Sequence, residues 1–169
     1  MNLTLKLMPF FLLFAMNAQA DELHVGFIDT QRILRESVPA LNAGKRIDKE
    51  FASRKVEIEK MQKQSKDIQT ALEKDGLKVE DHRIKERELS ALNTNLQRVQ
   101  REFREDLNLR TNEELATVMA RADKAIRAIA ESEKYDLILQ ESVYRNPKID
   151  ITDKILQYLA TEKPEKAEK

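Results

Sequence analysis

The fold is decided by residues 47–72, which read IDKEFASRKVEIEKMQKQSKDIQTAL. Apolar side chains recur there with alternating steps of four and three residues, and Arg54 and Ser65 are the two polar residues at positions of the same series. The apolar seats are Ile47, Phe51, Ile58, Met61, Ile68 and Leu72. This spacing is a heptad repeat, which predicts a helix that buries one stripe of side chains against a partner helix.

The partner stripe lies in the same chain, beyond a turn at Asp75-Gly76. It follows the same spacing and then drifts, through Leu89, Leu92, Leu96, Val99, Phe103, Leu107, Leu115, Val118, Ala122, Ile126 and Ile129. We therefore predict an antiparallel helical hairpin over residues 39–134, with its tip near 75–80. At a rise of about 1.5 Å per residue, its arms are roughly 50 Å and 80 Å long, so they must project from any small body.

We predict that the two ends of the mature chain, residues 21–38 and 135–160, form the small body from which the hairpin projects. A β-branched stretch at 24–29 and a second apolar stretch at 136–140 read as strands, and 141–145 reads as a third. A short helix is expected over 31–36, and a final one capped by Asp150 or Thr152. The charged segment 161–169 is expected to be disordered. The fold class is thus α+β, mostly α.

The first twenty residues read as a secretory signal peptide. Lys6 precedes an apolar run from Leu7 to Met16, and Ala18-Gln19-Ala20 forms an Ala-x-Ala cleavage site. A membrane anchor needs about 20 apolar residues, and this run is shorter and contains Pro9. We expect export and cleavage after Ala20. The chain has no Cys, so disulfides and a lipidated cysteine are both excluded.

Composition favours an oligomer and disfavours a nucleic-acid partner. There are 30 basic and 30 acidic residues, whereas a nucleic-acid binder is normally strongly basic. Charged residues make up 36% of the chain and aromatic residues 5%, so little apolar material remains for a core outside the heptad stripes. Stability must then come partly from assembly.

Nothing in the sequence predicts an enzyme, a metal or another cofactor. The two histidines, His24 and His82, are isolated, and there is no Cys to complete a zinc site. The three glycines are far apart and form no phosphate-binding loop.

The tip of the hairpin carries the candidate binding residues. The apolar candidates are Met61, Ile68, Leu72, Leu77, Val79 and Ile84, and the basic ones are Lys60, Lys63 and Lys66. The apolar side chains either fill the hairpin seam or offer adaptable patches to unfolded chains. For the lysines, an ordinary solvated helix face is favoured over a grip on anionic lipid or acidic client segments.

The ordered set of these features resembles the Skp/OmpH family of periplasmic chaperones. The resemblance rests on residues 25–34 (VGFIDTQRIL), on 103–106 (FRED) and 110–114 (RTNEE) in the hairpin, and on 135–139 (YDLIL) and 150–152 (DIT). It implies a periplasmic homotrimer with a β body and helical tentacles that hold unfolded outer-membrane β-barrel proteins without ATP. It further implies subunit contacts from Val25, Phe27, Ile28, Ile33, Leu34, Leu137, Ile138 and Leu139.

Two points of function stay open at the level of sequence. Some members of that family are strongly basic, whereas this chain is neutral, so we expect at most weak contact with anionic lipid. The alternative function is a coiled-coil spacer or linker of the cell envelope, which would not keep an unfolded barrel soluble.

Overall fold

A computed structural model describes residues 22–74 and 76–162. The predicted signal peptide and most of the predicted tail lie outside these residues. The elements, in order, are β1 (Val25–Phe27), α1 (Thr30–Glu36), α2 (Val38–Leu72), α3 (Val79–Glu133), β2 (Leu137–Leu139), the 3-10 helix η1 (Pro147–Ile149) and α4 (Thr152–Thr161). The chain is mostly helical, as predicted, with a small sheet built from its two ends.

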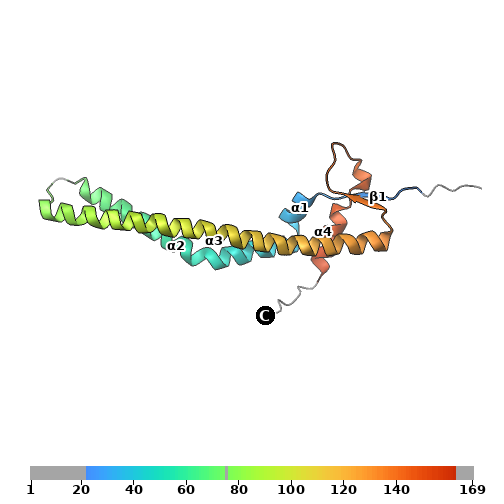
Figure 1. Ribbon diagram of the computed structural model, residues 1–169, viewed down its shortest axis with the longest axis horizontal. Helices are drawn as coiled ribbons and strands as arrows, with labels where there is room; N and C mark the ends of the chain where they lie inside the picture. Colours follow the sequence, from blue (N-terminus) through green and yellow to red (C-terminus); the bar gives the residue numbers. More distant parts are fainter. Residues whose placement is uncertain (1–21, 75, 163–169) are drawn as a thin grey trace, which may run out of the picture.

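Helices α2 and α3 form the long hairpin that the heptad pattern predicts, and it projects from the body at one end of the molecule (Figure 1). α2 begins after Ser37, whose hydroxyl accepts a hydrogen bond from the Ala40 amide at 3.3 Å. The turn at the tip includes Gly76, whose φ of 99° is readily adopted only by glycine. α3 ends at Glu133, and the following Lys134 adopts the left-handed conformation that stops helices.

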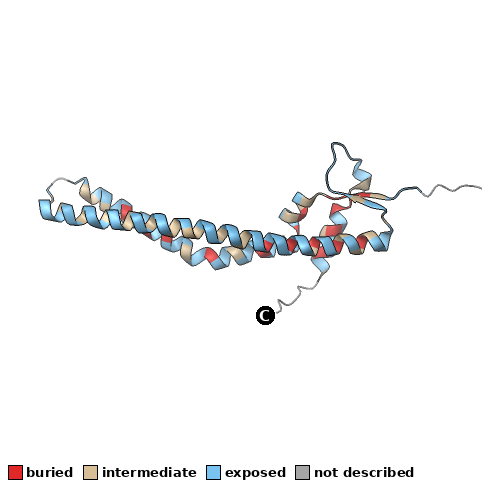
Figure 2. Cartoon of the chain, viewed as in Figure 1, coloured by how far each residue is buried: buried red, intermediate tan, exposed pale blue. Residues whose placement is uncertain are grey.

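The heptad positions of α2 face α3, and the buried ones are Phe51, Ile58, Met61 and Ser65. Figure 2 colours the buried positions of the arm red, between exposed stretches. Phe51 meets Phe103 edge-to-face with ring centroids 5.5 Å apart. The two polar seats are also accommodated in the seam. Arg54 lies over both phenyl rings and pairs with Asp106 at 2.7 Å, while the buried Ser65 donates a hydrogen bond to Asn93 Oδ1 at 2.7 Å.

The body contains a two-stranded parallel sheet in which Val25 pairs with Leu137 and Phe27 with Leu139. The predicted third strand at 141–145 was wrong, because these residues form an irregular loop that leads into η1. The free edge of β1 instead receives the chain after η1. There Ile151 donates its amide hydrogen to the Phe27 carbonyl at 2.9 Å, and Phe27 bridges to Asp150.

The core lies where α4 crosses α3 beneath the sheet. Ile155 and Leu159 of α4 pack with Ala122, Ala125 and Ile129 of α3, and Ile33 of α1 is enclosed with them. The predicted cap of α4 by Asp150 or Thr152 was wrong, because Ile151 is the N-cap residue and makes no side-chain capping bond. The Asp150 carboxylate, one residue earlier, accepts a hydrogen bond from the Thr152 amide at 2.9 Å.

Two further contacts bind the ends of the chain together. The Thr152 hydroxyl accepts a hydrogen bond from the amide of Asp29 at 2.9 Å, which joins α4 to the start of α1. The predicted disordered tail begins too early, because Thr161 is the last residue of α4 and Glu162 pairs with Arg121 at 2.9 Å. Residues 163–169 lie outside the described chain.

Candidate client-binding arm and assembly surface

The apolar candidates at the tip divide by exposure. Met61 is buried in the hairpin seam at 8% exposed, and Ile68, Leu72 and Leu77 are half-buried. Val79 and Ile84 project into solvent, with 79% and 52% of their surface exposed. The seam therefore accounts for Met61, whereas most of the Val79 surface and about half of the Ile84 surface remain available to another molecule.

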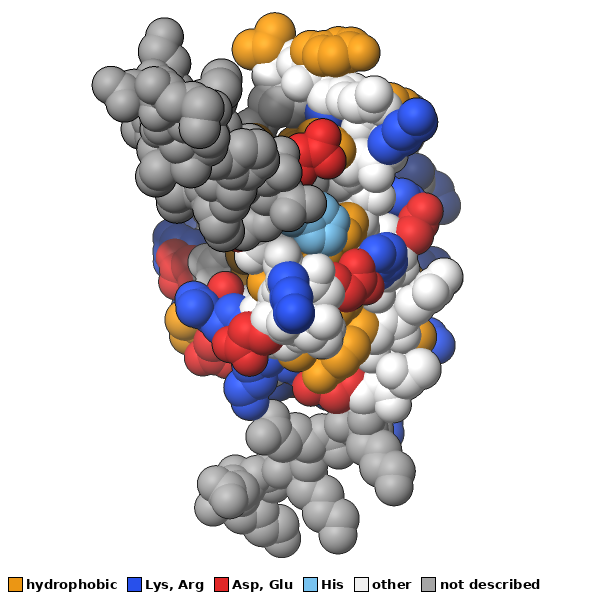
Figure 3. All heavy atoms as spheres, turned by 90° about the vertical axis from the view of Figure 1, so that its right-hand side faces the viewer, with side chains coloured by type: hydrophobic (Ala, Val, Ile, Leu, Met, Phe, Trp, Pro, Cys, Tyr) orange, Lys and Arg blue, Asp and Glu red, His pale blue; other side chains and the backbone are white. Residues whose placement is uncertain are grey.

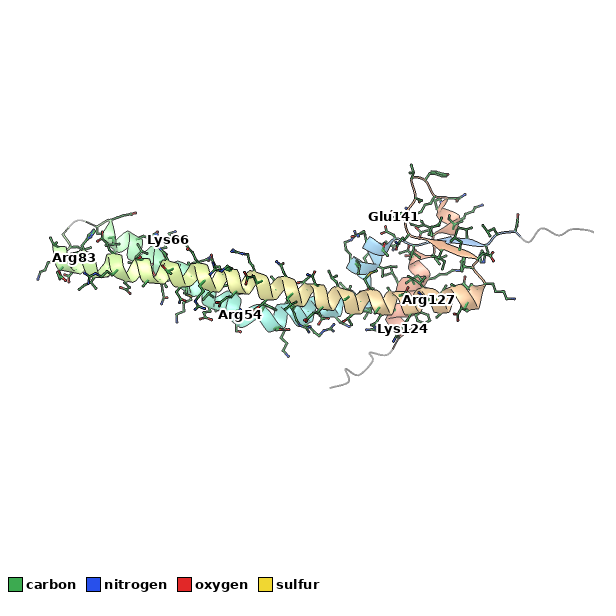
Figure 4. All side chains as sticks on the ribbon, in the orientation of Figure 1. Arg54, Lys66, Arg83, Lys124, Arg127 and Glu141 are labelled. Carbon is green, nitrogen blue, oxygen red and sulfur yellow. The ribbon has the colours of Figure 1, made fainter. Side chains whose placement is uncertain are left out.

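The basic candidates Lys60, Lys63 and Lys66 are all exposed on α2. Figure 4 shows Lys66 and Arg83 toward the distal end of the hairpin, on α2 and α3 respectively. Acidic residues lie on the same helices, including Asp67 on α2 and Glu88 on α3, so this end of the arm is mixed in charge. Over residues 22–74 and 76–162, the interleaved charges leave this end of the arm without a uniformly cationic face.

Two grooves run between α2 and α3. The larger has a volume of about 630 Å³ and lies toward the tip, where Ile68, Ala91 and Leu92 contribute its apolar surface. The smaller, of about 340 Å³, lies closer to the body and is lined by Ile58 and Phe103.

Sequence reasoning missed a further set of exposed apolar side chains along the middle of the arm. Val56 is 64% and Leu109 62% exposed, and Leu115 and Met119 are each 40% exposed. The sequence analysis placed Leu115 in the seam, but the structure puts Glu114 there instead. The drift of the heptad pattern in this region was the signal that the facing side chains change.

Glu114 is the centre of a charged cluster that fastens the two arms near the body. It accepts hydrogen bonds from Arg46 of α2 and from Arg110 of α3, the second at 2.7 Å, and Arg110 also reaches Glu50 at 3.0 Å. Only 6% of the Glu114 side chain is exposed. The hydrogen bond from Arg46 holds the pKa of Glu114 below its usual value despite the opposing effect of burial.

The assembly candidates also divide by exposure. Phe27, Ile28 and Ile33 are buried inside the subunit, so their contacts are made within one chain. Val25, Leu34 and Ile138 are half-buried, and Leu137 and Leu139 remain 45% and 37% exposed on β2. Figure 3, which looks onto the body end, shows hydrophobic side chains standing out at its upper rim.

The loop after β2 adds two apolar side chains that sequence reasoning assigned to a strand. Val143 is fully exposed and Tyr144 is 85% exposed, while the following Arg145 is held against the Phe27 ring at 4.2 Å and pairs with Asp150 at 3.2 Å. The loop is thus anchored at its base and presents Val143 and Tyr144 outward.

Residues 24–159, which include the body and both arms, match the model of a protein family described as "Outer membrane protein (OmpH-like)". The chain belongs to the OmpH-like family. It is 26% identical to the chaperone protein Skp of Yersinia enterocolitica, over 85% of this chain and 90% of the relative. It is 27% identical to Skp of Pectobacterium atrosepticum, over 82% and 85% of the two chains.

A solved structure supports the fold of this OmpH-like chain. The crystal structure of a protein described as an OmpH-like outer membrane chaperone from Caulobacter crescentus matches with a TM-score of 0.66 and 17% identity, over 82% of this chain and 84% of that one. The resemblance to the Skp/OmpH family drawn from the sequence is thus confirmed.

Among residues 22–74 and 76–162, no group of three His, Cys, Asp or Glu side chains is placed to hold a metal ion. Over the same residues, no helix has both the length and the hydropathy needed to cross a membrane. His82 at the tip lies 3.4 Å from Glu86, and His24 in the body stacks on Tyr135.

Proposed function

We propose that this protein is an ATP-independent holdase of the periplasm, which binds unfolded outer-membrane β-barrel proteins and prevents their aggregation in transit. The proposal is supported by membership of the OmpH-like family and by similarity to proteins named chaperone protein Skp. The observation that carries it is the projecting arm, whose side chains Val79, Ile84, Val56 and Leu109 are all more than half exposed.

Such an arm fits the chemistry of holding better than that of a fixed pocket. An unfolded barrel presents many apolar side chains at irregular positions, so one deep cavity would match few of them. Exposed valine, leucine and isoleucine side chains spread along a helical hairpin can each make a weak contact wherever the client offers a partner. Several arms acting together raise the avidity without any new type of contact.

The proposal includes assembly into a homotrimer through the body. Within the described chain, β2 pairs only with β1, so its outer edge carries backbone groups that are free to pair with another strand. Leu137 and Leu139 on this strand, and Val143 and Tyr144 on the next loop, supply exposed apolar surface beside that edge. A second copy of the chain would cover both.

Export is the remaining part of the proposal. Removal of residues 1–20 by cleavage after Ala20 would release the protein into the periplasm, where unfolded barrels pass. Lys60, Lys63 and Lys66 would make at most weak, salt-sensitive contact with anionic lipid, because acidic side chains are interleaved with them.

The function is tested by diluting a urea-unfolded outer-membrane barrel into buffer that contains the protein. We expect turbidity to stay low with the wild type and to rise when Val79 and Ile84 are both replaced by Asp, since the charges remove apolar contact at exposed positions. Replacement of both Lys78 and Lys85 by Gln, at the same end of the arm, is the matched control and should leave holding nearly unchanged. Unimpeded aggregation with the wild type would favour the envelope spacer.

A further inference from the structure

The larger groove of the arm differs from the smaller one in the charge of its rim. Asp67 of α2 and Glu88 of α3 stand on its two sides, with the amides of Gln64 and Asn95 beside them, and no basic residue lines it. The smaller groove is bordered by Lys55 and Arg104 as well as Glu59. An acidic rim is therefore specific to the groove near the tip.

The two rim carboxylates have no partner within the described chain. Neither Asp67 nor Glu88 makes an ion pair or a side-chain hydrogen bond with any residue of 22–74 or 76–162. Lys63 and Lys85 lie one helical turn from them, yet neither of these lysines is paired with a carboxylate over the same residues. The carboxylates remain available to a cation from outside.

The floor between the carboxylates is apolar. Ile68 and Leu92 are half-buried there and Ala91 is exposed, so a ligand side chain could remove apolar surface from water at the same place. One turn before Glu88, the exposed Ile84 lies on the same face of α3 and extends the apolar strip toward the tip.

From this arrangement we propose that the tip groove binds extended client segments in which apolar residues alternate with Lys or Arg. In an extended chain, successive side chains point to opposite faces, so the apolar ones can enter the floor. The long stem of a neighbouring Lys or Arg can bend back from the other face to bring its charge to Asp67 or Glu88 at the rim. Transmembrane barrel strands alternate in this way between apolar and polar residues. The inference rests on the proposed function and names the segments that the arm selects.

The test uses two short unstructured peptides, one alternating Val with Lys and one alternating Val with Glu, each carrying a fluorescent label. Wild-type protein should bind the Val–Lys peptide more tightly by fluorescence anisotropy, and added salt should reduce the difference because the carboxylates are exposed. In the variant Asp67→Asn/Glu88→Gln, binding of the Val–Lys peptide should weaken about fivefold, as expected for the loss of two exposed charge pairs.

A matched control removes the same two charges outside the groove. Asp48 and Glu105 are exposed and line neither groove, so Asp48→Asn/Glu105→Gln should leave the preference for the Val–Lys peptide intact. A second variant, Ala91→Lys, places bulk and a cation in the groove and should weaken the Val–Lys peptide at least as much. Circular dichroism checks that each variant retains the helical content of the wild type.

The outcomes separate this inference from the proposed function. If Asp67→Asn/Glu88→Gln and Ala91→Lys bind the Val–Lys peptide as the wild type does, or if the control loses as much affinity, the groove assignment is overturned. The proposed function survives that result provided that the wild type still keeps the unfolded barrel soluble. If the wild type binds neither peptide and leaves the barrel to aggregate, both fail.

Discussion

At the scale of the residue, Glu114 shows how much depends on one side chain in a sparse core. Its carboxylate is nearly buried, and it joins Arg46 on one arm to Arg110 on the other. An ion pair that loses one buried partner leaves an uncompensated charge, although here Arg46 is half-exposed and water would screen it. The contact fixes how the two arms are aligned where they leave the body.

We expect Glu114→Ala to lower the free energy of unfolding by about 1–2 kcal/mol. The exposed pair of Arg127 and Asp123, one turn apart on α3, provides the control, and Asp123→Asn should cost less than about 0.5 kcal/mol. Urea denaturation of the three proteins measures both values. Equal effects of the two substitutions would mean that burial of Glu114 adds nothing.

The stabilising effect of Glu114 should depend on pH. Because its folded pKa lies below the usual value, the ionised form is favoured by folding, so the contribution is complete above about pH 4.3 and is lost as pH falls through the folded pKa. The gap in stability between wild type and Glu114→Gln should thus be constant near neutral pH and narrow in acid. A gap that widened in acid would contradict the assigned direction.

Lys134 carries the one left-handed backbone conformation of a non-glycine residue within the described chain. Glycine adopts this conformation without the clash between Cβ and the carbonyl oxygen, so Lys134→Gly should stabilise the protein by about 0.5–1 kcal/mol. Lys134→Ala keeps a Cβ and should give no such gain. Thermal unfolding compares the two, and the same shift in Tm for both would rule out relief of strain as the cause.

At the scale of the element, the hairpin was predictable because its heptad pattern is long and its arms contain no proline after Pro39. The seam from Phe51 to Ser65 could be read seat by seat. That Glu114 and not Leu115 lies in the seam could not be predicted, because a buried carboxylate is recognisable only when its two arginine partners are known to lie beside it. The prediction of a strand at 141–145 was wrong because it also depended on contacts that the sequence does not show. Asp150 and Ile151 already occupy the free edge of β1.

The polar pair inside the seam gives a prediction for the hairpin as a unit. Ser65 is buried, and its hydrogen bond to Asn93 ties α2 to α3 near the tip groove. Ser65→Ala should cost about 1 kcal/mol, and the double variant Ser65→Ala/Asn93→Ala should lose less than the sum of the two single variants, with a coupling of about 0.5–1.5 kcal/mol. Urea denaturation supplies the four values of the cycle, and strictly additive losses would show that the pair does not act together.

At the scale of the whole molecule, a small body holds one end of a long, largely exposed arm. The core beneath the sheet explains why Ile28 and Ile33, expected between subunits, are enclosed by their own chain. The sequence predicts that these residues are buried. Whether they are buried in an internal core or in a subunit interface depends on where α4 folds back. Leu137 and Leu139 remain the residues best placed for assembly.

Assembly through β2 makes a direct prediction. Replacing Leu137 and Leu139 with Asp should convert the proposed trimer to monomers, because two charges on each strand would have to be buried in the interface. Substitution of the exposed Val56 and Leu109 by Asp, on the arm, should leave the mass unchanged. Analytical ultracentrifugation reports the masses, and a trimer that persists in the β2 variant would place the interface elsewhere.

The central claim is that the protein holds unfolded barrels as an assembled chaperone, and one measurement addresses it most directly. Light scattering behind size exclusion gives the mass of the protein alone and after mixing with a urea-unfolded outer-membrane barrel. We predict a mass three times that of one mature chain, and a discrete soluble complex under conditions in which the barrel alone precipitates. A monomer that elutes without barrel, while the barrel precipitates, would contradict the account.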